Sequence, residues 1–301
     1  MTSPASPIKP ILVCMSWRGG QRFVRCLRSI EESRHHFSRV IISVTGSIDG
    51  PDMKVARDFQ RDDSSIEVIC TGVELPTMKH QSFWLTYLRT TKARPDEWVY
   101  WLAYDDEVRL RGIEAITDEG SWPLRQGTAY FGPWALRHEQ PDHLWSGDPT
   151  AMVESWTSFP KDGPFQLPVA EWISQQLKQP TYMQMSGSVN PLSSFISLHK
   201  NWPRKRGPMR IEMAIAAQPG ISTVAEFAEP VSIIYGRSDS DRASYGRAAR
   251  LEDVHLLGTL GKRCVKSLPE ASTYASALLT ALRARRSEPG EEWRVRGMVT
   301  P

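Results

Sequence analysis

The stretch WVYWLAYDDE, residues 98–107, joins an apolar run directly to three consecutive acidic side chains. Its first six residues have the length and hydrophobicity of a buried β-strand. Asp105, Asp106 and Glu107 repel one another, and removing them from water costs several kcal/mol unless another group compensates their charge. A divalent cation held by oxygen ligands is the usual compensation, and a solvated turn between strand and loop is the alternative. The position of the run in the fold decides between the two.

The chain before residue 98 alternates strand-like and helix-like patterns. Short apolar runs at residues 11–15, 40–44 and 66–70 have the length of buried strands. Between them apolar side chains recur at helical spacing, for example Phe23, Leu27 and Ile30. This alternation predicts a parallel α/β sheet in which residues 98–103 form the fourth strand. Since ligands of open α/β sheets bind beyond the carboxyl ends of the strands, we expect segments 16–20, 45–52 and 104–107 to share one edge of the sheet.

The second half of the sequence is less regular. We expect a strand at 128–136, helices around 169–177, 195–199 and 211–215, a loop at 183–187 and a last strand at 231–235. Tyr274, Leu278 and Leu282 are in helical phase and predict a helix near the carboxyl terminus. We therefore divide the chain into a first α/β half at 1–110, a second half of the same domain at 111–245 and a helical extension at 246–301.

The composition argues against several classes of protein. A formal net charge of +3 is too small to indicate nucleic acid as the main partner. No stretch approaches the ~18 consecutive apolar residues of a membrane span, and no signal-peptide segment opens the chain. Cys14, Cys26, Cys70 and Cys264 are far apart and show no C-x-x-C spacing, which is typical of reduced thiols in a cytoplasmic protein. Peripheral contact with the inner face of a membrane is compatible with this pattern.

Four segments of the first half resemble inverting glycosyltransferases of the family-2 type. Residues 13–18 (VCMSWR) and 25–30 (RCLRSI) are similar to the first strand, polar loop and "CLxSI"-type helix of that family. Residues 41–49 (IISVTGSID) resemble its second strand and "DDGSxD" turn, and residues 104–107 (YDDE) resemble its DxD-type motif. The similarity covers residues 10–110 in register and continues more weakly to about residue 242. It implies the GT-A fold, a Rossmann-like α/β fold with a mostly parallel central sheet and an irregular, helix-rich acceptor half.

The resemblance implies a role for each matched position on the donor side. Ser16 and Arg18 would lie near the nucleotide, and Asp49 would lie beside its base or ribose. Lys79 and His80 stand where the family often places a basic or polar contact to the donor. The first half would then be the nucleotide-sugar-binding half of the domain.

The acidic run would be the metal site of such an enzyme. Asp105 would face the ribose or the water shell of the metal, while Asp106 or Glu107 would bind the cation, with Asp106 as the firmest ligand. Which two of the three take the DxD roles stays open at this point. Thr45 and Gly46 depart from the family pattern, because acidic residues usually stand there and take part in uracil recognition.

The second half would carry the catalytic base and would bind the acceptor. The family places its base on an acidic residue that opens a helix, and Glu212 is the matching candidate, with Glu226 and Asp162 as rivals. A favourable interaction with the helix dipole is the alternative explanation for Glu212. Residues 230–240 resemble the late segment that helps to close the site; they contain no His, and Arg237 is a candidate contact to the diphosphate.

These features predict a metal-dependent, inverting transfer of a sugar to an acceptor hydroxyl. The donor would be a nucleotide-diphospho-sugar, with a UDP-linked sugar favoured, and the cation would be Mn²⁺ or Mg²⁺. A glycan, a glycolipid or a small molecule would be the acceptor. Two alternatives stay open: a sugar nucleotidyltransferase, of whose Gly-rich phosphate loop Arg18, Gly19 and Gly20 are a fragment, and a non-catalytic nucleotide-sugar-binding protein on a transferase fold.

Overall fold

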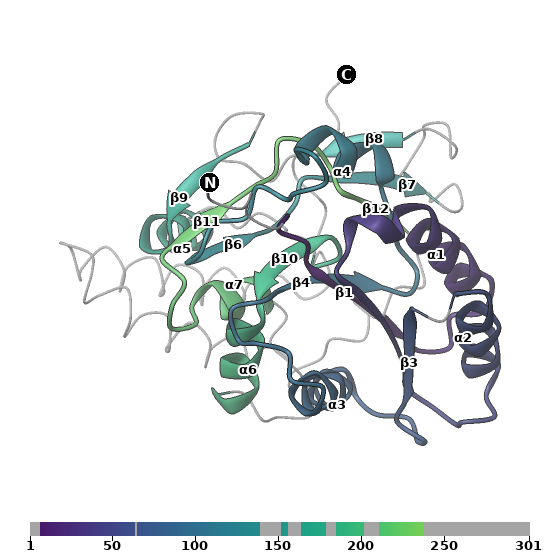
Figure 1. Ribbon diagram of the computed structural model, residues 1–301. Coiled ribbons are helices and arrows are strands. Elements are labelled where there is room, and N and C mark those ends of the chain that lie inside the picture. The colour runs from purple at the N-terminus through teal and green to yellow at the C-terminus, as the bar shows by residue number, and fades with distance from the viewer. Residues whose placement is uncertain are drawn as a thin grey trace, which may run out of the picture.

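The computed structural model describes residues 7–63, 65–138, 152–155, 164–178, 185–201 and 211–236. These residues form an eight-stranded sheet in the order β3-β2-β1-β4-β10-β6-β11-β9 and a four-stranded sheet in the order β5-β12-β7-β8 (Figure 1). The large sheet contains strands from both predicted halves of the domain. The predicted helical extension at 246–301 lies outside the described residues.

The first half confirms the predicted alternation of strands and helices. Its elements are β1 (Ile11–Ser16), α1 (Gly20–Ser33), the 3₁₀ turn η1 (Arg34–His36), β2 (Arg39–Val44), α2 (Pro51–Asp62), β3 (Ile66–Cys70), α3 (Thr77–Thr90) and β4 (Trp98–Ala103). The four strands pair in parallel, with β1 at the centre between β2 and β4. The carboxyl ends of all four strands therefore lie along one edge of the sheet, as the sequence predicts.

Helices cover both faces of the large sheet, and successive residues of β1 point to opposite faces. Ile11, Val13 and Met15 pack with α3, α5 (Val169–Lys178), α6 (Leu192–Asn201) and α7 (Ile211–Ala216). Leu12 and Cys14 pack with α1, α2 and α4 (Leu110–Ile116) on the other face. A strand buried on both faces is uniformly apolar, which explains why the period-2 pattern of a half-exposed strand is missing here.

After β4 the chain contains more strands than the sequence predicts. They are β5 (Glu107–Val108), at the end of the first half, and, in the second half, β6 (Thr128–Tyr130), β7 (Trp134–His138), β8 (Met152–Ser155), β9 (Gln166–Pro168), β10 (Ser188–Pro191), β11 (Thr223–Ala225) and β12 (Ser232–Gly236). The helices predicted around residues 169–177, 195–199 and 211–215 are confirmed as α5, α6 and α7, and the predicted last strand is confirmed as β12. The helix predicted through Tyr274, Leu278 and Leu282 lies outside the described residues.

One prediction in this half is wrong, and the central strand β10 is not predicted. The single strand expected at 128–136 is two strands, because β6 belongs to the large sheet and β7 to the small one. The break falls at Gly132 and Pro133, where proline has no N–H with which to continue a ladder. The sequence also gives no indication of β10, which lies between β4 and β6. Its four residues, SVNP, are buried but half polar, so no apolar run marks them.

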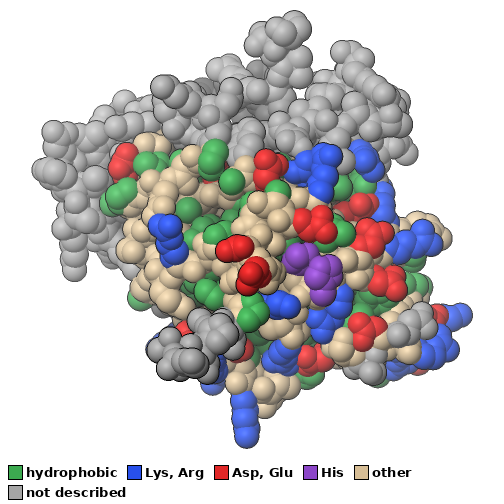
Figure 2. Space-filling view, turned by 45° about the horizontal axis from the view of Figure 1, so that its top comes forward, with side chains coloured by type: hydrophobic (Ala, Val, Ile, Leu, Met, Phe, Trp, Pro, Cys, Tyr) green, Lys and Arg blue, Asp and Glu red, His purple; other side chains and the backbone are tan. Residues whose placement is uncertain are grey.

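On the described part of the face that Figure 2 presents, Lys and Arg side chains are interspersed with Asp and Glu side chains. In the described part of the chain, none of the helices has the length and hydrophobicity needed to cross a membrane.

Candidate functional site

The candidate site is the rim, by which we mean the loops that follow the carboxyl ends of β1, β2, β3 and β4. Residues 17–19 connect β1 to α1, residues 45–50 connect β2 to α2, and residues 71–76 connect β3 to α3. The acidic run, Asp105 to Glu107, follows β4. The strand order places the β3 loop at one end of the rim and the acidic run at the other.

The acidic run bridges the two sheets. It leaves the large sheet after Ala103, and Glu107 already belongs to β5, which pairs with β12 of the small sheet. Asp105 is half-buried, whereas Asp106 is buried with 6% of its surface exposed. The Asp106 carboxylate accepts a hydrogen bond from the backbone N–H of Tyr235 on β12, at 3.1 Å. Of the two aspartates in the run, Asp105 is therefore the more accessible to solvent.

Arg25 of α1 compensates part of the charge of the run. Its Nε lies 2.8 Å from Oε1 of Glu107, and its Nη2 donates to the backbone carbonyl of Asp105 at 3.1 Å. The same guanidinium stacks on the ring of Tyr235, 3.5 Å from its centroid. The Tyr235 hydroxyl donates to Glu107 at 2.6 Å. Burial and this carboxylate raise the pKa of Tyr235 to about 12, so its hydroxyl stays a donor.

The turn at Ser186 and Gly187 forms a wall beside the run. Ser186 Oγ accepts a hydrogen bond from the backbone N–H of Ala103, and the N–H of Gly187 donates to the carbonyl of Trp101. The Ser232 hydroxyl donates to the Ser186 carbonyl and joins the turn to β12. Gly187 has a φ of +82°, and a Cβ there would collide with the side chain of Ser232. Only glycine fits this close approach without rearrangement.

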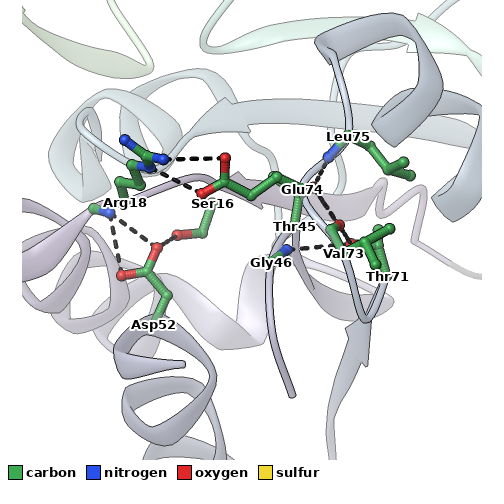
Figure 3. A network of polar contacts seen from close by, with 10 residues as sticks. Ser16, Arg18, Thr45, Gly46, Asp52, Thr71, Val73, Glu74 and Leu75 are labelled. Carbon is green, nitrogen blue, oxygen red and sulfur yellow. Dashed lines mark hydrogen bonds and ion pairs between the residues drawn. The ribbon is translucent and has the colours of Figure 1, made fainter. Parts of the chain in front are cut away.

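At the start of α1, the first backbone N–H groups donate to a buried carboxylate. Asp52, from the first turn of α2, accepts hydrogen bonds from the backbone N–H groups of Gly19 and Gly20. It also accepts a hydrogen bond from the hydroxyl of Ser16 (Figure 3). The Ser16 bond is 2.5 Å long, and Ser16 is fully buried. Asp52 therefore acts as the cap of α1, whose N-cap residue Gly19 has no side chain to do so.

Thr45, at the end of β2, holds the β3 loop instead of facing the solvent. Its side chain is buried, accepts the N–H of Leu75 at 2.8 Å and donates to the carbonyl of Val73 at 3.3 Å. Thr71 supports it by donating to the Val73 carbonyl and accepting the N–H of Gly46 (Figure 3). The residue at the position that the resemblance links to base recognition is thus part of the structural frame of the rim.

Two of the predicted donor contacts are exposed on the rim and one is buried. Asp49 and Lys79 are exposed, on the β2 loop and in the first turn of α3. His80 is buried under the sheet, where its Nε2 lies 2.8 Å from the Ser43 hydroxyl of β2. Burial lowers the pKa of His80 to about 4, so the ring is neutral at physiological pH. A cationic contact to the donor from this part of the chain has to come from Lys79.

Arg18 is also exposed, and it bridges two loops of the rim. Its Nε and Nη2 donate to the two carboxylate oxygens of Glu74 on the β3 loop, at 2.9 and 3.1 Å (Figure 3). Its guanidinium lies over the ring of Trp17, 5.4 Å from the centroid. Arg18 has a φ of +52°, a left-handed conformation that is uncommon for a side chain of this size.

The remaining site predictions fall at or beyond the limits of the described residues. Glu212 is the second residue of α7, and its side chain is not among those described. Asp162 and Arg237 lie outside the described residues. Glu226 is buried just after β11, and its backbone N–H donates to the carbonyl of Phe165. In the described part of the chain, no three His, Cys, Asp or Glu side chains come together as a preformed metal site.

The sequence interpretation gave no site role to Arg25, Tyr235 or Asp52. The helical periodicity around Arg25 predicts the helix but not the direction in which this side chain points. Nothing in the sequence indicates that Arg25 contacts Glu107, 82 residues later. Asp52 follows Pro51 in the first turn of a helix, where an acidic residue is common for reasons of the helix dipole. The sequence indicates Asp52 only as the last residue of the turn-rich segment 45–52, which is expected at the edge of the sheet where ligands bind.

Comparisons with known proteins bear on the fold. No protein-family model matches the chain, and no curated protein matches it in sequence. Among solved structures, TarS residues 1–349 of S. aureus in complex with UDP-GlcNAc superposes with a TM-score of 0.54 at 10% identity, over 91% of this chain and 72% of that one. GalNAc-T7 with UDP, GalNAc and Mn²⁺ superposes with a TM-score of 0.55 at 8% identity, over 94% of this chain and 59% of that one. The chain therefore has the α/β fold of GT-A-type glycosyltransferases, as the resemblance in its sequence implies.

Proposed function

We propose that this protein is a glycosyltransferase that transfers a sugar from a nucleoside diphosphate donor to an acceptor hydroxyl. One observation carries the proposal: the acidic run follows the central strand β4 and shares a rim with the loops of β1, β2 and β3, in a fold of the GT-A type. The ends of parallel strands are where such sheets bind ligands. The solved structures of TarS with UDP-GlcNAc and of GalNAc-T7 with UDP support a nucleotide-sugar donor and, by analogy, a UDP-linked one.

The acidic run is suited to Mn²⁺ or Mg²⁺ bound together with the donor. Such cations prefer oxygen ligands, and Mg²⁺ is commonly held by one or two carboxylates with substrate phosphates and water completing its shell. A preformed cage of three protein ligands is therefore not required. We propose that Asp106 binds the cation and that Asp105 faces the ribose or contributes to the same shell. The contacts of Glu107 with Arg25 and Tyr235 favour a positioning role for it.

The proposed reaction proceeds with inversion, and the acceptor half provides its base. A bound cation would supply stabilisation of the negative charge that develops on the leaving diphosphate. Glu212, at the start of α7, would accept the proton of the acceptor hydroxyl as its oxygen attacks the anomeric carbon from the face opposite the leaving group. The transition state would have oxocarbenium character. Glu226 is the rival base, and Arg237 is a proposed contact to the diphosphate.

The contacts of Asp52 argue against the nucleotidyltransferase alternative. Such an enzyme needs free backbone N–H groups in a Gly-rich loop to cradle phosphates near the first strand. Here the N–H groups of Gly19 and Gly20 already donate to Asp52. A diphosphate could bind there only by displacing a buried carboxylate that also accepts the Ser16 hydroxyl.

A panel of nucleotide sugars tests the proposal. We expect one donor to raise the unfolding midpoint in the presence of Mn²⁺, because a ligand that binds only the folded state stabilises it by mass action. The same donor should support transfer to an acceptor from a panel of glycans, glycolipids and small molecules. Donor binding without transfer to any acceptor would favour the non-catalytic alternative. If no nucleotide sugar bound, the proposal would be wrong.

Site variants then test the residue assignments. Asp106→Asn should lower Mn²⁺-dependent turnover by about a hundredfold or more while the unliganded protein stays folded. Asp105→Asn serves as the comparison, and full activity of Asp106→Asn would contradict the metal assignment.

Glu212→Gln should lower kcat with little change in KM, because the base acts in the chemical step. Loss of kcat in Glu226→Gln with a fully active Glu212→Gln would assign the base to Glu226.

A further inference from the structure

The rim carries an apolar surface that the proposed metal site does not use. Trp17, Ile48 and Val73 are three of the four large hydrophobic side chains that are exposed in the described part of the chain, with 37%, 51% and 61% of their surfaces accessible. They lie on three different loops, after β1, β2 and β3. Because these strands are neighbours in the order β3-β2-β1, the three side chains flank one region of the rim, next to the end that holds the acidic run.

A carboxylate with a planar partner lies on this surface. Glu74 accepts two parallel hydrogen bonds from Arg18, whose guanidinium lies over the ring of Trp17. The guanidinium is a flat group with two adjacent N–H donors, which lies over an indole and pairs edge-on with a carboxylate. A nucleobase with N–H donors on its edge would present the same chemistry to the same two residues. The hydrogen bonds from Arg18 also lower the pKa of Glu74.

The contacts of Thr45 fix the position of the β3 loop on both sides of Glu74. Thr45 binds the carbonyl of Val73 and the N–H of Leu75, the two residues that flank Glu74. Its side chain is thereby turned inward, and the β3 loop is held over the end of β2. Glu74 thus presents an exposed carboxylate on the rim, whereas Thr45 beneath it is buried.

We propose that Glu74 recognises the ring N–H of the donor's nucleobase, which stacks on Trp17 in the place that the Arg18 guanidinium now occupies. This inference rests on the proposed function. An ionised carboxylate only accepts hydrogen bonds. Uracil and guanine carry a ring N–H on the pairing edge, whereas cytosine and adenine carry an acceptor nitrogen there. Guanine presents two adjacent donors and therefore matches both oxygens of Glu74.

Arg18 gains a second role in this arrangement. When the base takes its place on Glu74, the guanidinium is released at the β1 loop, between the base and the acidic run. A positive charge at that point favours the donor diphosphate. Arg18 and Glu74 therefore make separable contributions: Arg18 to the phosphates, whatever the base, and Glu74 to the base alone.

Calorimetric titration of the whole chain with UDP, GDP, CDP and ADP in the presence of Mn²⁺ tests the proposal. We expect UDP and GDP to bind about tenfold or more tightly than CDP and ADP. Glu74→Gln should weaken GDP and UDP, with the larger loss for GDP, and should remove most of the discrimination against CDP and ADP. Glu32→Gln, an exposed position on α1, is the matched control and should change no affinity. Arg18→Ala should weaken all four nucleotides by similar factors.

Three results would overturn the inference without touching the proposed function. They are equal affinity of the wild type for all four nucleotides, unchanged affinities in Glu74→Gln, and an equal loss for all four nucleotides in that variant. Since Arg18 and Glu74 are exposed, an unchanged unfolding midpoint of the unliganded variants confirms that they remain folded. If the wild type bound none of the four nucleotides, the proposed function itself would be overturned together with this inference.

Discussion

Two carboxylates of the rim, Asp52 and Glu107, are both held by neighbouring groups but in different ways. In the described part of the chain, the donors to Asp52 are neutral: the hydroxyl of Ser16 at the end of β1 and the backbone N–H groups of Gly19 and Gly20 at the start of α1. Glu107 pairs with a cation, Arg25, and with the hydroxyl of Tyr235, which come from α1 and β12. The first arrangement is local and dipolar, whereas the second links distant segments through a charge.

This difference separates structural from functional use of acidic side chains. A carboxylate whose oxygens already accept hydrogen bonds from fixed neutral donors is not expected to be stabilised further by a metal. A carboxylate paired with an arginine has its charge partly compensated, and binding or release of a metal cation nearby would change that compensation. We therefore expect the contacts of Asp52 to stabilise the fold, and the charge balance around Glu107 to respond to a bound cation. Three changes break or sharpen this comparison.

The largest effect is expected from Asp52→Ala. It leaves the N–H groups of Gly19 and Gly20 and the buried hydroxyl of Ser16 without their acceptor, so we expect the free energy of unfolding to fall by about 3 kcal/mol. Chemical denaturation followed by circular dichroism measures the change. Asp49→Ala, in the exposed loop just before, is the matched control and should stay within about 0.5 kcal/mol of the wild type.

The conservative variant Asp52→Asn adds a second check on the same group. Its side-chain carbonyl can still accept hydrogen bonds, so we expect a loss between those of the wild type and Asp52→Ala. A stability of Asp52→Ala equal to that of the control would contradict the structural role of Asp52.

A smaller effect is expected when the pH is lowered, through His80 beneath the β2 strand. Burial lowers its pKa from 6.5 to about 4 in the folded chain, so the unfolded chain binds a proton more readily between these values. The stability that this neutral ring contributes is present above about pH 6.5 and is lost as the pH falls toward 4. We expect His80 to account for about 2 kcal/mol of lost stability between pH 7.5 and pH 5.

Comparison of the wild type with His80→Gln isolates this contribution. His199, whose pKa burial also lowers to about 4, is present in both proteins and cancels in the difference. The variant should lose less stability over the same pH interval, whatever its stability at neutral pH. Parallel stability curves for the two proteins would show that His80 is not held neutral by the fold.

The sequence predicts the first four strands, their helices and the shared rim, because strands buried on both faces leave long apolar runs at regular intervals. It fails where strands are short or polar, as with β10, whose Asn190 and Ser188 are buried although neither is apolar. It fails again at residues 128–136, where Pro133 sends the chain from one sheet to the other. In both cases the tertiary structure overrides a pattern that covers only a few residues.

The candidate site shows the same limit. The position of Asp105, Asp106 and Glu107 follows from a local rule, since a strand of apolar residues ends just before them. Their partners do not, because Arg25 and Tyr235 meet Glu107 from 82 and 128 residues away along the chain. A single sequence offers no means of pairing such residues. From the sequence, either a divalent cation or a solvated turn could compensate the charge of the acidic run, and in the structure Arg25 compensates part of it.

The smallest effect on stability, and the sharpest test of the comparison, is expected from Arg25→Gln. The Glu107 side chain is only 15% exposed, so loss of its cationic partner should lower the free energy of unfolding by about 1 kcal/mol. Removal of one positive charge also makes the field at the acidic run more negative. If the run binds a divalent cation, the affinity for Mn²⁺ in the presence of the donor nucleotide should then rise by about tenfold. Stability and metal affinity thus change in opposite directions, which a general weakening of the fold cannot produce.

Arg28→Gln, one turn further along the exposed side of α1, is the control and should alter neither quantity. Weaker Mn²⁺ binding in Arg25→Gln, in a variant that remains folded, would mean that Arg25 holds the metal site together rather than competing with its cation, and that the acidic run depends on this arginine as Asp52 depends on its backbone donors.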